Sequence, residues 1–295
     1  MLKLINLRQG FFMSTWKSNR KLAFLLVFIT YVVASVIGVI VFGALNLPVW
    51  LSLLIADVAS TAAVFVVSLI VKNSSVYDPY WSIQPIVILT LFAAKVGLTW
   101  SSGLVLGVIC IWGLRLTVNW AYTFQNLNWQ DWRYTMLKEK TGAIYPLINF
   151  LGIHLFPTIV VYLCIMPAVY LIIARAELNC WQLIGCVISL SATILQGVSD
   201  VQMHKYRLNR TTTFIRNGLW KYSRHPNYLG EILMWWGVAI ACTLTLGKPY
   251  LLTGAVVNTL MFLFVSIPMA DKRQAKKQGF MEYKKQTRML LPIKK

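Results

Sequence analysis

Eight long apolar segments, separated by short polar stretches, dominate the sequence. They run at about 22–43, 49–71, 85–100, 104–121, 147–171, 182–200, 229–246 and 250–270. Each approaches the roughly 20 residues that an α-helix needs to cross a bilayer, and the third is the weakest because Lys95 interrupts it. The pattern predicts an all-α, polytopic membrane bundle of about eight transmembrane helices, with tight outer turns at 46–48, 101–103 and 247–249.

The composition agrees with a membrane protein. Hydrophobic residues make up 58% of the chain, the mean hydropathy is +0.63, and only 13% of the residues are charged, whereas soluble domains carry about 25%. The basic N-terminal segment precedes an apolar run longer than the core of a cleavable signal, so a retained signal anchor is expected.

The basic residues behind the net charge of +19 are distributed in a way that indicates the membrane topology. With the N-terminus inside, the inner segments hold 24 of the 28 lysines and arginines, and the outer loops hold only Arg175 and Lys248. The positive-inside rule therefore places both termini in the cytoplasm. The basic charge is expected to contact anionic lipids rather than nucleic acid.

Cysteine and histidine usage favours neither disulfides nor a metal site. The five cysteines are scattered without a C-x-x-C pair, and three histidines are too few for a multi-histidine di-iron centre. No metal is expected, and the oligomeric state is left open.

Polar residues crowd into the stretch 200–231, between two apolar runs. It holds two of the nine acids and two of the three histidines. Charged groups at a membrane edge are costly unless they serve each other or a ligand, so chemistry is expected here. The residues concerned are Asp200, His204, Arg207, Arg216, Lys221, Arg224, His225, Asn227 and Glu231.

The sixth apolar run continues into a polar stripe. Gln196, Asp200, His204 and Arg207 are spaced to share one helix face. Asp200 could accept a hydrogen bond from a ligand hydroxyl or amide, and Arg207 could bind phosphate in a bidentate manner. The alternative is a hydrogen-bonded helix end without a ligand.

The seventh run is predicted to begin at Pro226, a residue suited to the first position of a helix. The free amides of that helix end would favour an anion. Asn227, Tyr228 and Glu231 would then form a polar first turn. A capped helix with interfacial anchors explains Arg224 and Tyr228, but not Glu231 together with Asn227.

An acidic residue surrounded by aromatics precedes the third run. Asp78 lies beside Tyr77, Tyr80 and Trp81, and such an acid can stay protonated and donate a hydrogen bond to a carbonyl. The alternative is a proline turn in an interfacial aromatic belt.

Three further cations carry open alternatives. Arg115, inside the fourth run, could point to an anionic ligand or snorkel to lipid phosphates. Arg133 could simply pair with Asp131. In the C-terminal tail, residues 271–292, Arg273 is the cation nearest the bilayer and the one best placed to reach a phosphate.

Four polar segments, 77–82, 129–134, 200–231 and 271–292, all emerge on the inner side of the membrane under this topology. Their convergence predicts one composite site facing the cytoplasm.

Several motifs together resemble a known superfamily. They are G-L-W-K-Y-S-R-H-P-N-Y-L-G-E at 218–231, S-D at 199–200, Y-x8-P at 283–292, D-P-Y-W-S at 78–82, R-L-T at 115–117 and D-W-R-Y at 131–134. The set is similar to the steroid 5-alpha-reductase C-terminal domain superfamily, in particular its bacterial branch long labelled a domain of unknown function. The resemblance covers roughly 75–295 and leaves 1–74 as a basic segment with two accessory helices.

The resemblance implies a bacterial inner-membrane enzyme that holds NADPH in a cavity open to the cytoplasm. Asp78 occupies roughly the place of the acid that binds the substrate carbonyl in steroid reductases, and Tyr80 is our addition to that catalytic pair. Arg115 and Arg273 are added to the cofactor side on the arguments above. The cofactor-side positions that match by motif are Asp200, Arg207, Arg224, Asn227, Tyr228 and Glu231, with His225 beside them.

The R-H-P-x-Y-x-G element also resembles isoprenylcysteine and phospholipid methyltransferases, which bind S-adenosylmethionine. A methyltransferase needs no phosphate clamp, whereas this chain supplies five candidate cations at Arg115, Arg207, Arg216, Arg224 and Arg273. We therefore expect an NADPH-dependent reductase of a carbonyl-conjugated double bond in a lipophilic substrate. The sequence leaves open which lipid it is, and whether NADPH or NADH is preferred.

Overall fold

The structure is a computed structural model that describes residues 16–294. Within that range the regular elements are helical, and the sole β-type pairing is a parallel bridge between Ser223 and Arg288. Eight helical segments in this part of the chain are long and apolar enough to cross a membrane. The predicted polytopic helical bundle is confirmed, while the cytoplasmic placement of both termini stays a prediction. The expected signal anchor begins in residues 1–15, which lie outside the described range.

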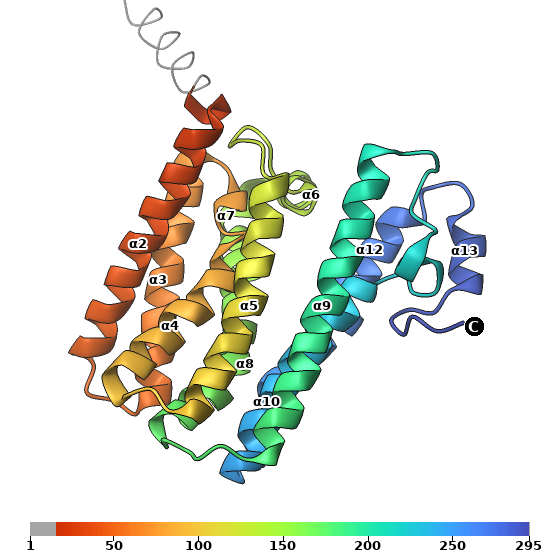
Figure 1. Cartoon of the computed structure of the whole chain (residues 1–295). Helices are drawn as coiled ribbons and strands as arrows, with labels where there is room; N and C mark the ends of the chain where they lie inside the picture. Colours follow the sequence, from red (N-terminus) through yellow and green to blue (C-terminus); the bar gives the residue numbers. More distant parts are fainter. Residues whose placement is uncertain (1–15, 295) are drawn as a thin grey trace, which may run out of the picture. The chain divides into compact units, whose positions relative to one another are not determined.

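The helices follow the predicted apolar runs (Figure 1). π-Helical stretches at Asn149–Leu155 and Phe262–Ser266 extend two of the segments, so that 132–173 and 249–274 each count as one candidate span. The bounds are α2 (Arg20–Ala44), α3 (Val49–Val71), α4 (Tyr80–Val96), α5 (Trp100–Thr123), α6 (Trp132–Thr141), α7 (Tyr145–Ile148), α8 (Phe156–Ile173), α9 (Cys180–Leu208), α10 (Pro226–Leu246), α11 (Thr253–Met261), α12 (Ile267–Gln274) and α13 (Phe280–Gln286).

Helix α4 begins at Tyr80, directly after Asp78 and Pro79 as expected, and accommodates Pro85 in its interior. The turn predicted after this helix was misplaced. The following turn lies at 97–99, where Gly97 adopts a φ of 97°. The predicted turn at 101–103 instead forms the start of α5, since Thr99 and Ser102 exchange capping hydrogen bonds of 2.9 and 3.1 Å there.

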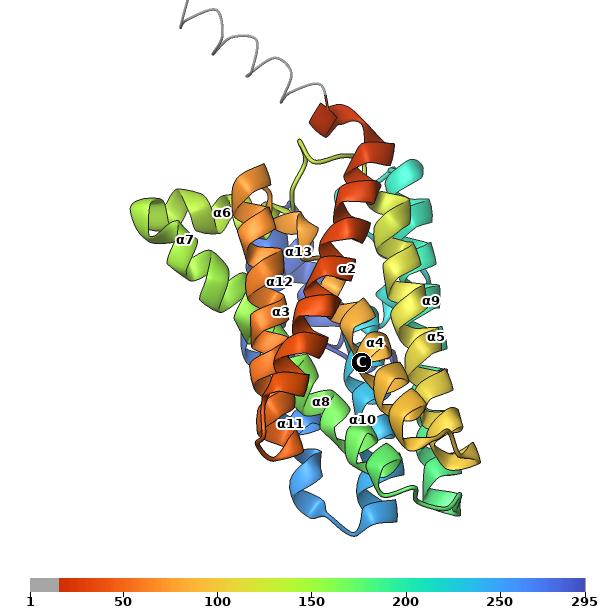
Figure 2. The ribbon, with the colours of Figure 1, turned by 90° about the vertical axis from the view of Figure 1, so that its left-hand side faces the viewer.

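The described chain forms two compact units. The first unit comprises the described residues up to Val87 together with Leu116–Tyr162. Its helices α2 and α3 lie side by side (Figure 2) and approach closely at Gly38, where an added Cβ would meet the Ser60 hydroxyl. That hydroxyl donates to the Ala34 carbonyl at 2.8 Å. Small residues that let helix backbones approach are typical of packing in membranes.

The second unit comprises Ile88–Arg115 and the chain from Leu163 onward. Its central feature is the pair α9 and α10, which lie side by side (Figure 1). An added Cβ at Gly185 would meet the carbonyl of Gly237, and one at Gly237 would meet Ser189. Glycine at these positions is required by the close approach, and this spacing brings polar side chains of the two helices within hydrogen-bond range.

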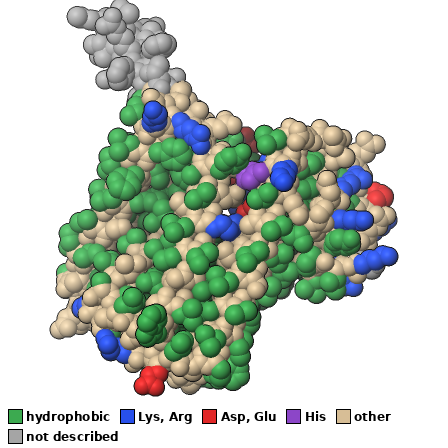
Figure 3. Space-filling model, viewed as in Figure 1, with side chains coloured by type: hydrophobic (Ala, Val, Ile, Leu, Met, Phe, Trp, Pro, Cys, Tyr) green, Lys and Arg blue, Asp and Glu red, His purple; other side chains and the backbone are tan. Residues whose placement is uncertain are grey.

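The outward faces of the helices are apolar. Hydrophobic side chains spread over the face shown in Figure 3, and exposed fractions reach 65% at Phe28, 66% at Val118 and 66% at Ile194. Such side chains on α2, α5 and α9 provide the lipid-facing surface that a spanning helix needs.

Candidate functional site

The second unit holds a buried acid that accepts three side-chain hydrogen bonds. Glu231 on α10 is 4% exposed. It accepts from Gln196 Nε2 at 2.6 Å, from Trp112 Nε1 at 2.9 Å and from Trp235 Nε1 at 3.0 Å. The two indole rings pack edge to face, with centroids 4.8 Å apart. Donors from three helices therefore fix this carboxylate, which would otherwise be very costly to bury.

Local sequence explains how Glu231 reaches its partners. Helix α10 begins at Pro226 as predicted, so Glu231 lies in its second turn and Trp235 one turn further on the same face. The preceding residue, Gly230, faces α9 so closely that an added Cβ would lie 2.7 Å from the Ala192 carbonyl. The missing side chain at Gly230 allows Gln196 to reach across to Glu231.

A second acid, Asp200, lies on α9 one turn beyond Gln196. Asp200 Oδ2 accepts from Arg115 Nη1 at 2.8 Å, and both side chains are 18% exposed. Arg115 follows Trp112 by three residues on α5, and Asp200 follows Gln196 by four on α9. The two helices thus present two successive polar layers, one around Glu231 and the next around Asp200.

Several polar atoms of these layers are buried without a hydrogen-bond partner anywhere in residues 16–294. They are Nε and Nη2 of Arg115, Oε1 of Gln196 and Oδ1 of Asn227, one turn before Glu231. Buried donors and acceptors left unpaired cost about 1–3 kcal/mol each. Two guanidinium donors and two amide acceptors are therefore available to a polar ligand, which is the strongest indication of a binding site.

The predicted stripe on α9 forms one continuous helical face. The helix extends to Leu208, past Asp200, His204 and the exposed Arg207, and the guanidinium of Arg207 acts electrostatically on Asp200. Beyond them a pocket of about 400 Å³ opens at the end of α9. Its lining residues are Gln202, Lys205, Tyr206, Asn209, Thr211, Thr212, Ile215, Arg216, Asn217 and Gly218.

Arg224 and His225 belong to a different arrangement, centred on Asp271. Arg224 Nη2 and Nε lie 3.3 and 3.4 Å from the two Asp271 oxygens, and His225 Nε2 lies 3.0 Å from one of them. Arg224 Nη1 donates to the Thr287 carbonyl at 2.9 Å. Lys284 Nζ is 3.2 Å from the same carboxylate. The guanidinium predicted to bind phosphate is thus already engaged with groups of the chain itself.

These contacts tie the segment before α10 to the tail. The Arg224 amide donates to the Arg288 carbonyl, and the Arg288 amide donates to Tyr222, both at 3.0 Å. The Tyr283 hydroxyl donates to the Trp220 carbonyl at 2.5 Å, and burial raises the pKa of Tyr283 to about 12. The tail is therefore a fixed part of the second unit.

The structure separates the predicted cofactor residues into groups. Arg115, Asp200, Asn227 and Glu231 line the two polar layers, whereas Arg224 and His225 hold the tail. Tyr228 stacks on the His225 ring with centroids 5.1 Å apart, while Arg207 and Arg273 are exposed. The assignment of each residue to a cofactor stays a prediction.

In the first unit, Asp78 and the D-W-R-Y segment lie together. Tyr134 donates its hydroxyl hydrogen to Asp78 Oδ1 at 2.5 Å, and Asp131 caps α6 while pairing with Arg133 at 2.8 Å. Tyr80 is 2% exposed, and its ring packs 5.4 Å from Tyr31. The catalytic roles predicted for Asp78 and Tyr80 remain predictions.

Sequence reasoning missed a buried acid in the second span. Asp57 on α3 is 4% exposed and accepts from Gln84 Nε2 at 3.1 Å, with the Tyr80 hydroxyl nearby. An aspartate within an apolar run was the available signal. It also missed the indole donors of Trp112 and Trp235, because in a sequence both residues look like ordinary core aromatics.

Part of the chain is similar to a known protein. It is 26% identical over 198 residues to the uncharacterized protein C594.04c of Schizosaccharomyces pombe (strain 972 / ATCC 24843), a match that covers 57% of each protein. The chain thus spans little more than half the length of that relative. No solved structure matches the chain. Residues 64–287 match the family described as "Protein of unknown function (DUF1295)", and because this match covers most of the sequence, the chain belongs to the DUF1295 family.

Proposed function

We propose that this chain is a membrane-embedded, NADPH-dependent reductase of a carbonyl-conjugated double bond in a lipophilic substrate. The observation that carries the proposal is the partly unpaired guanidinium of Arg115. It is paired on one side with Asp200 and leaves two buried donors for an anionic or polar ligand. The motif resemblance to the steroid 5-alpha-reductase superfamily supplies the reaction class.

The residues of the two polar layers fit the nicotinamide half of such a cofactor. A carboxamide and a ribose offer donors to the carbonyl oxygens of Gln196 and Asn227, and a phosphate offers acceptors to Arg115. The carboxyl groups of Asp200 and Glu231 are held in place by Arg115 and by Gln196. When bound, NADPH supplies a hydride.

The pocket at the end of α9 suits the rest of the nucleotide. Its volume of about 400 Å³ lies in the range typical of small-molecule sites. Lys205 and Arg216 line it together with hydroxyl and amide side chains, including Thr212 and Asn217. Such a lining favours phosphate and ribose oxygens. We assign the adenosine end of the cofactor to this pocket.

On the substrate side, the proposal keeps Asp78 as the group that polarises the carbonyl. The 2.5 Å hydrogen bond from Tyr134 holds one carboxyl oxygen in place, which fixes the orientation of the acid. A hydrogen bond from a protonated Asp78 would stabilise the negative charge that develops on the carbonyl oxygen. Tyr80 is proposed to support the same group.

The contact between Arg224 and Asp271 bears on the alternative function, that of an S-adenosylmethionine-dependent methyltransferase. One of the five candidate cations now serves the tail, so the excess of cations over the needs of a methyltransferase is smaller than the sequence indicated. The proposal for a reductase therefore rests on the remaining four cations, of which Arg115 has unpaired buried donors and Arg216 lines the pocket at the end of α9. Binding of S-adenosylmethionine is the outcome that would favour the alternative.

The test is cofactor binding to the detergent-purified protein. NADPH, NADH and S-adenosylmethionine are titrated separately, following thermal stability and fluorescence transfer from the twelve tryptophans. We expect saturable NADPH binding that weakens at least about tenfold in Arg115→Gln, since a charged hydrogen bond contributes about 1.5–3 kcal/mol. Arg210→Gln, at an exposed arginine beyond α9, is the matched control.

A second variant guards against misfolding. Asn227→Ala removes an unpaired acceptor without breaking a side-chain hydrogen bond to the rest of the described chain, so it should weaken NADPH binding while leaving the unliganded melting temperature unchanged. Binding of S-adenosylmethionine alone, or NADPH binding indifferent to both variants, would contradict the proposal.

A further inference from the structure

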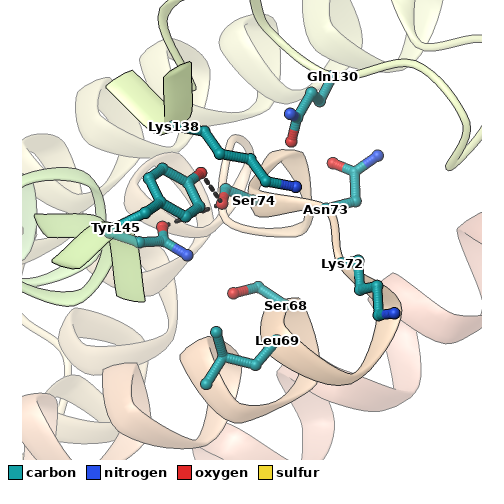
Figure 4. A pocket seen from close by; sticks show the side chains of 9 residues that line it. Ser68, Leu69, Lys72, Asn73, Ser74, Gln130, Lys138 and Tyr145 are labelled. Carbon is teal, nitrogen blue, oxygen red and sulfur yellow. Dashed lines mark hydrogen bonds between the residues drawn. The ribbon is translucent and has the colours of Figure 1, made fainter. Parts of the chain in front are cut away.

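A small polar pocket lies in the first unit, at the end of α3 (Figure 4). Its volume is about 130 Å³. It is formed by the end of α3 and the residues just after it, together with the segment that runs through α6 and α7. The lining residues are Ser68, Leu69, Lys72, Asn73, Ser74, Gln130, Lys138, Tyr145 and Asn149.

Hydrogen bonds hold part of the pocket wall in place. Ser74 Oγ donates to Asn149 Oδ1 at 3.0 Å and lies 3.1 Å from the Tyr145 hydroxyl. Asn73 Nδ2 donates to two backbone carbonyls of the 127–129 segment at 2.7 and 2.8 Å. The side chains of Asn73, Ser74 and Asn149 are each no more than 3% exposed. This wall is therefore preorganised, which reduces the cost of binding a ligand.

The pocket is lined by two lysines and by no acidic residue of the described chain. Lys138 extends over it with its amine toward Asn73, and Lys72 lies at its rim (Figure 4). Neither forms an ion pair within the described range, and the lining contains no acidic residue. Nearby, Lys17 Nζ donates to the Val71 carbonyl at 2.7 Å, and burial together with repulsion from Lys72 lowers the pKa of Lys17. The local field favours an anion.

The pocket also lies at a boundary between apolar and polar surface. The candidate span of α3 ends at Val71, immediately before Lys72. Leu69 contributes an apolar wall and is 41% exposed. A basic and polar pocket at the end of a spanning helix is the setting in which side chains contact lipid headgroups.

We propose that this pocket binds a phosphate group with net negative charge, the chemistry shared by anionic phospholipid headgroups and soluble phosphate. Lys138 and Lys72 supply the cations, and the hydroxyl of Tyr145 supplies a neutral hydrogen-bonding group. The volume admits a phosphate with some water, given that a water occupies roughly 30 Å³ of liquid. This site is independent of the proposed reductase function, because none of its residues is assigned to cofactor or substrate.

The test is residue-resolved acylation of lysines in the full chain, read by mass spectrometry. The delipidated protein in detergent is labelled alone, with phosphatidylglycerol, with phosphatidylcholine, or with inorganic phosphate. With phosphatidylglycerol or with inorganic phosphate, we expect acylation of Lys72 and Lys138 to fall severalfold. Acylation of Lys21 and Lys140, which are exposed lysines of the same unit outside the pocket, should stay unchanged. Protection by phosphatidylglycerol alone identifies a lipid as the source of the phosphate, and protection by inorganic phosphate identifies a soluble ester.

Paired double variants provide the affinity readout. The double variant Lys72→Gln/Lys138→Gln should lower the affinity for the protecting anion by roughly 25-fold, on the basis of about fivefold for each lysine. Lys21→Gln/Lys140→Gln removes the same charge elsewhere in the unit and should leave the affinity within about twofold. Equal effects of the two double variants, or no selective protection in the unaltered protein, would overturn the proposal.

Discussion

The amide of Gln196 donates a 2.6 Å hydrogen bond to the carboxylate of Glu231, joining α9 to α10. The amide nitrogen is the end of Gln196 that faces Glu231, since Nε2 is the donor in this contact. The carbonyl oxygen of Gln196 is consequently turned away and is buried without a partner among residues 16–294. A single structural contact thus creates an oriented acceptor for a ligand.

Replacing Glu231 by glutamine should weaken both the fold and the site. The substitution keeps the shape but removes the charge that three donors share, and its new N–H group would face another donor. We expect a loss of about 1–3 kcal/mol in stability and at least about tenfold weaker NADPH binding. Thermal unfolding and fluorescence titration measure the two effects. Glu282→Gln, at an exposed position of α13, should change neither.

The glycine contacts between α9 and α10 predict a strong packing effect. Gly237→Ala would drive a methyl group into Ser189 and the carbonyl of Gly185. Overpacking of this kind costs about 1–3 kcal/mol or more, and the separated helices would lose the bond between Gln196 and Glu231. The melting temperature should therefore fall. Gly107→Ala on α5, where an added Cβ meets nothing within 4 Å, is the control, and an equal fall there would refute the packing argument.

The sequence revealed the spans and the first turn of α10 because these depend on local patterns. Apolar runs of spanning length and a proline at a helix start need no knowledge of distant partners. Glu231 and Asp200 were also recognisable, since acids beside apolar runs are costly. The turn at 97–99 was misplaced because serine and glycine favour turns, yet here Thr99 and Ser102 together cap the start of α5.

The partners of these groups were not recognisable. Arg224 and Asp271 are separated by 47 residues, and nothing local in either segment indicates their pairing. The motif around Arg224 suggested a phosphate ligand, whereas the tail supplies the carboxylate and carbonyls that satisfy it. Asp57 was overlooked because a hydropathy run averages over a single acid, and its partner Gln84 lies on another helix.

Asp271→Asn should loosen the tail. The change removes the charge that pairs with Arg224 and contacts His225, and breaking a buried pair from one side costs about 3–5 kcal/mol. The region after α12 contains several exposed lysines, so limited trypsin digestion should cut there much faster than in the unaltered protein. Lys272→Gln, next to Asp271 but exposed, should keep the original cleavage rate. An uncut tail in Asp271→Asn would show that other contacts suffice.

Asp78→Asn should separate catalysis from cofactor binding. Asparagine can still accept from Tyr134 but cannot supply an acidic proton to a substrate carbonyl. We expect NADPH affinity to stay within about twofold, while NADPH oxidation with an enone lipid falls by on the order of 100-fold. Asp57→Asn is measured in parallel. Full turnover in Asp78→Asn together with loss in Asp57→Asn would move the substrate-side role to α3.

Arg216→Gln should change the preference between the two nicotinamide cofactors. Arg216 lines the pocket at the end of α9, and its guanidinium lies over the Phe214 ring at 4.3 Å. NADPH differs from NADH by one phosphate on the adenosine ribose, and a single arginine–phosphate contact contributes about 1.5–3 kcal/mol. The variant should therefore bind NADPH at least about tenfold more weakly and NADH almost unchanged. Lys221→Gln, an exposed cation outside the pocket, tests for a general charge effect. If Arg216→Gln weakened both cofactors equally, the adenosine phosphate would have to bind elsewhere.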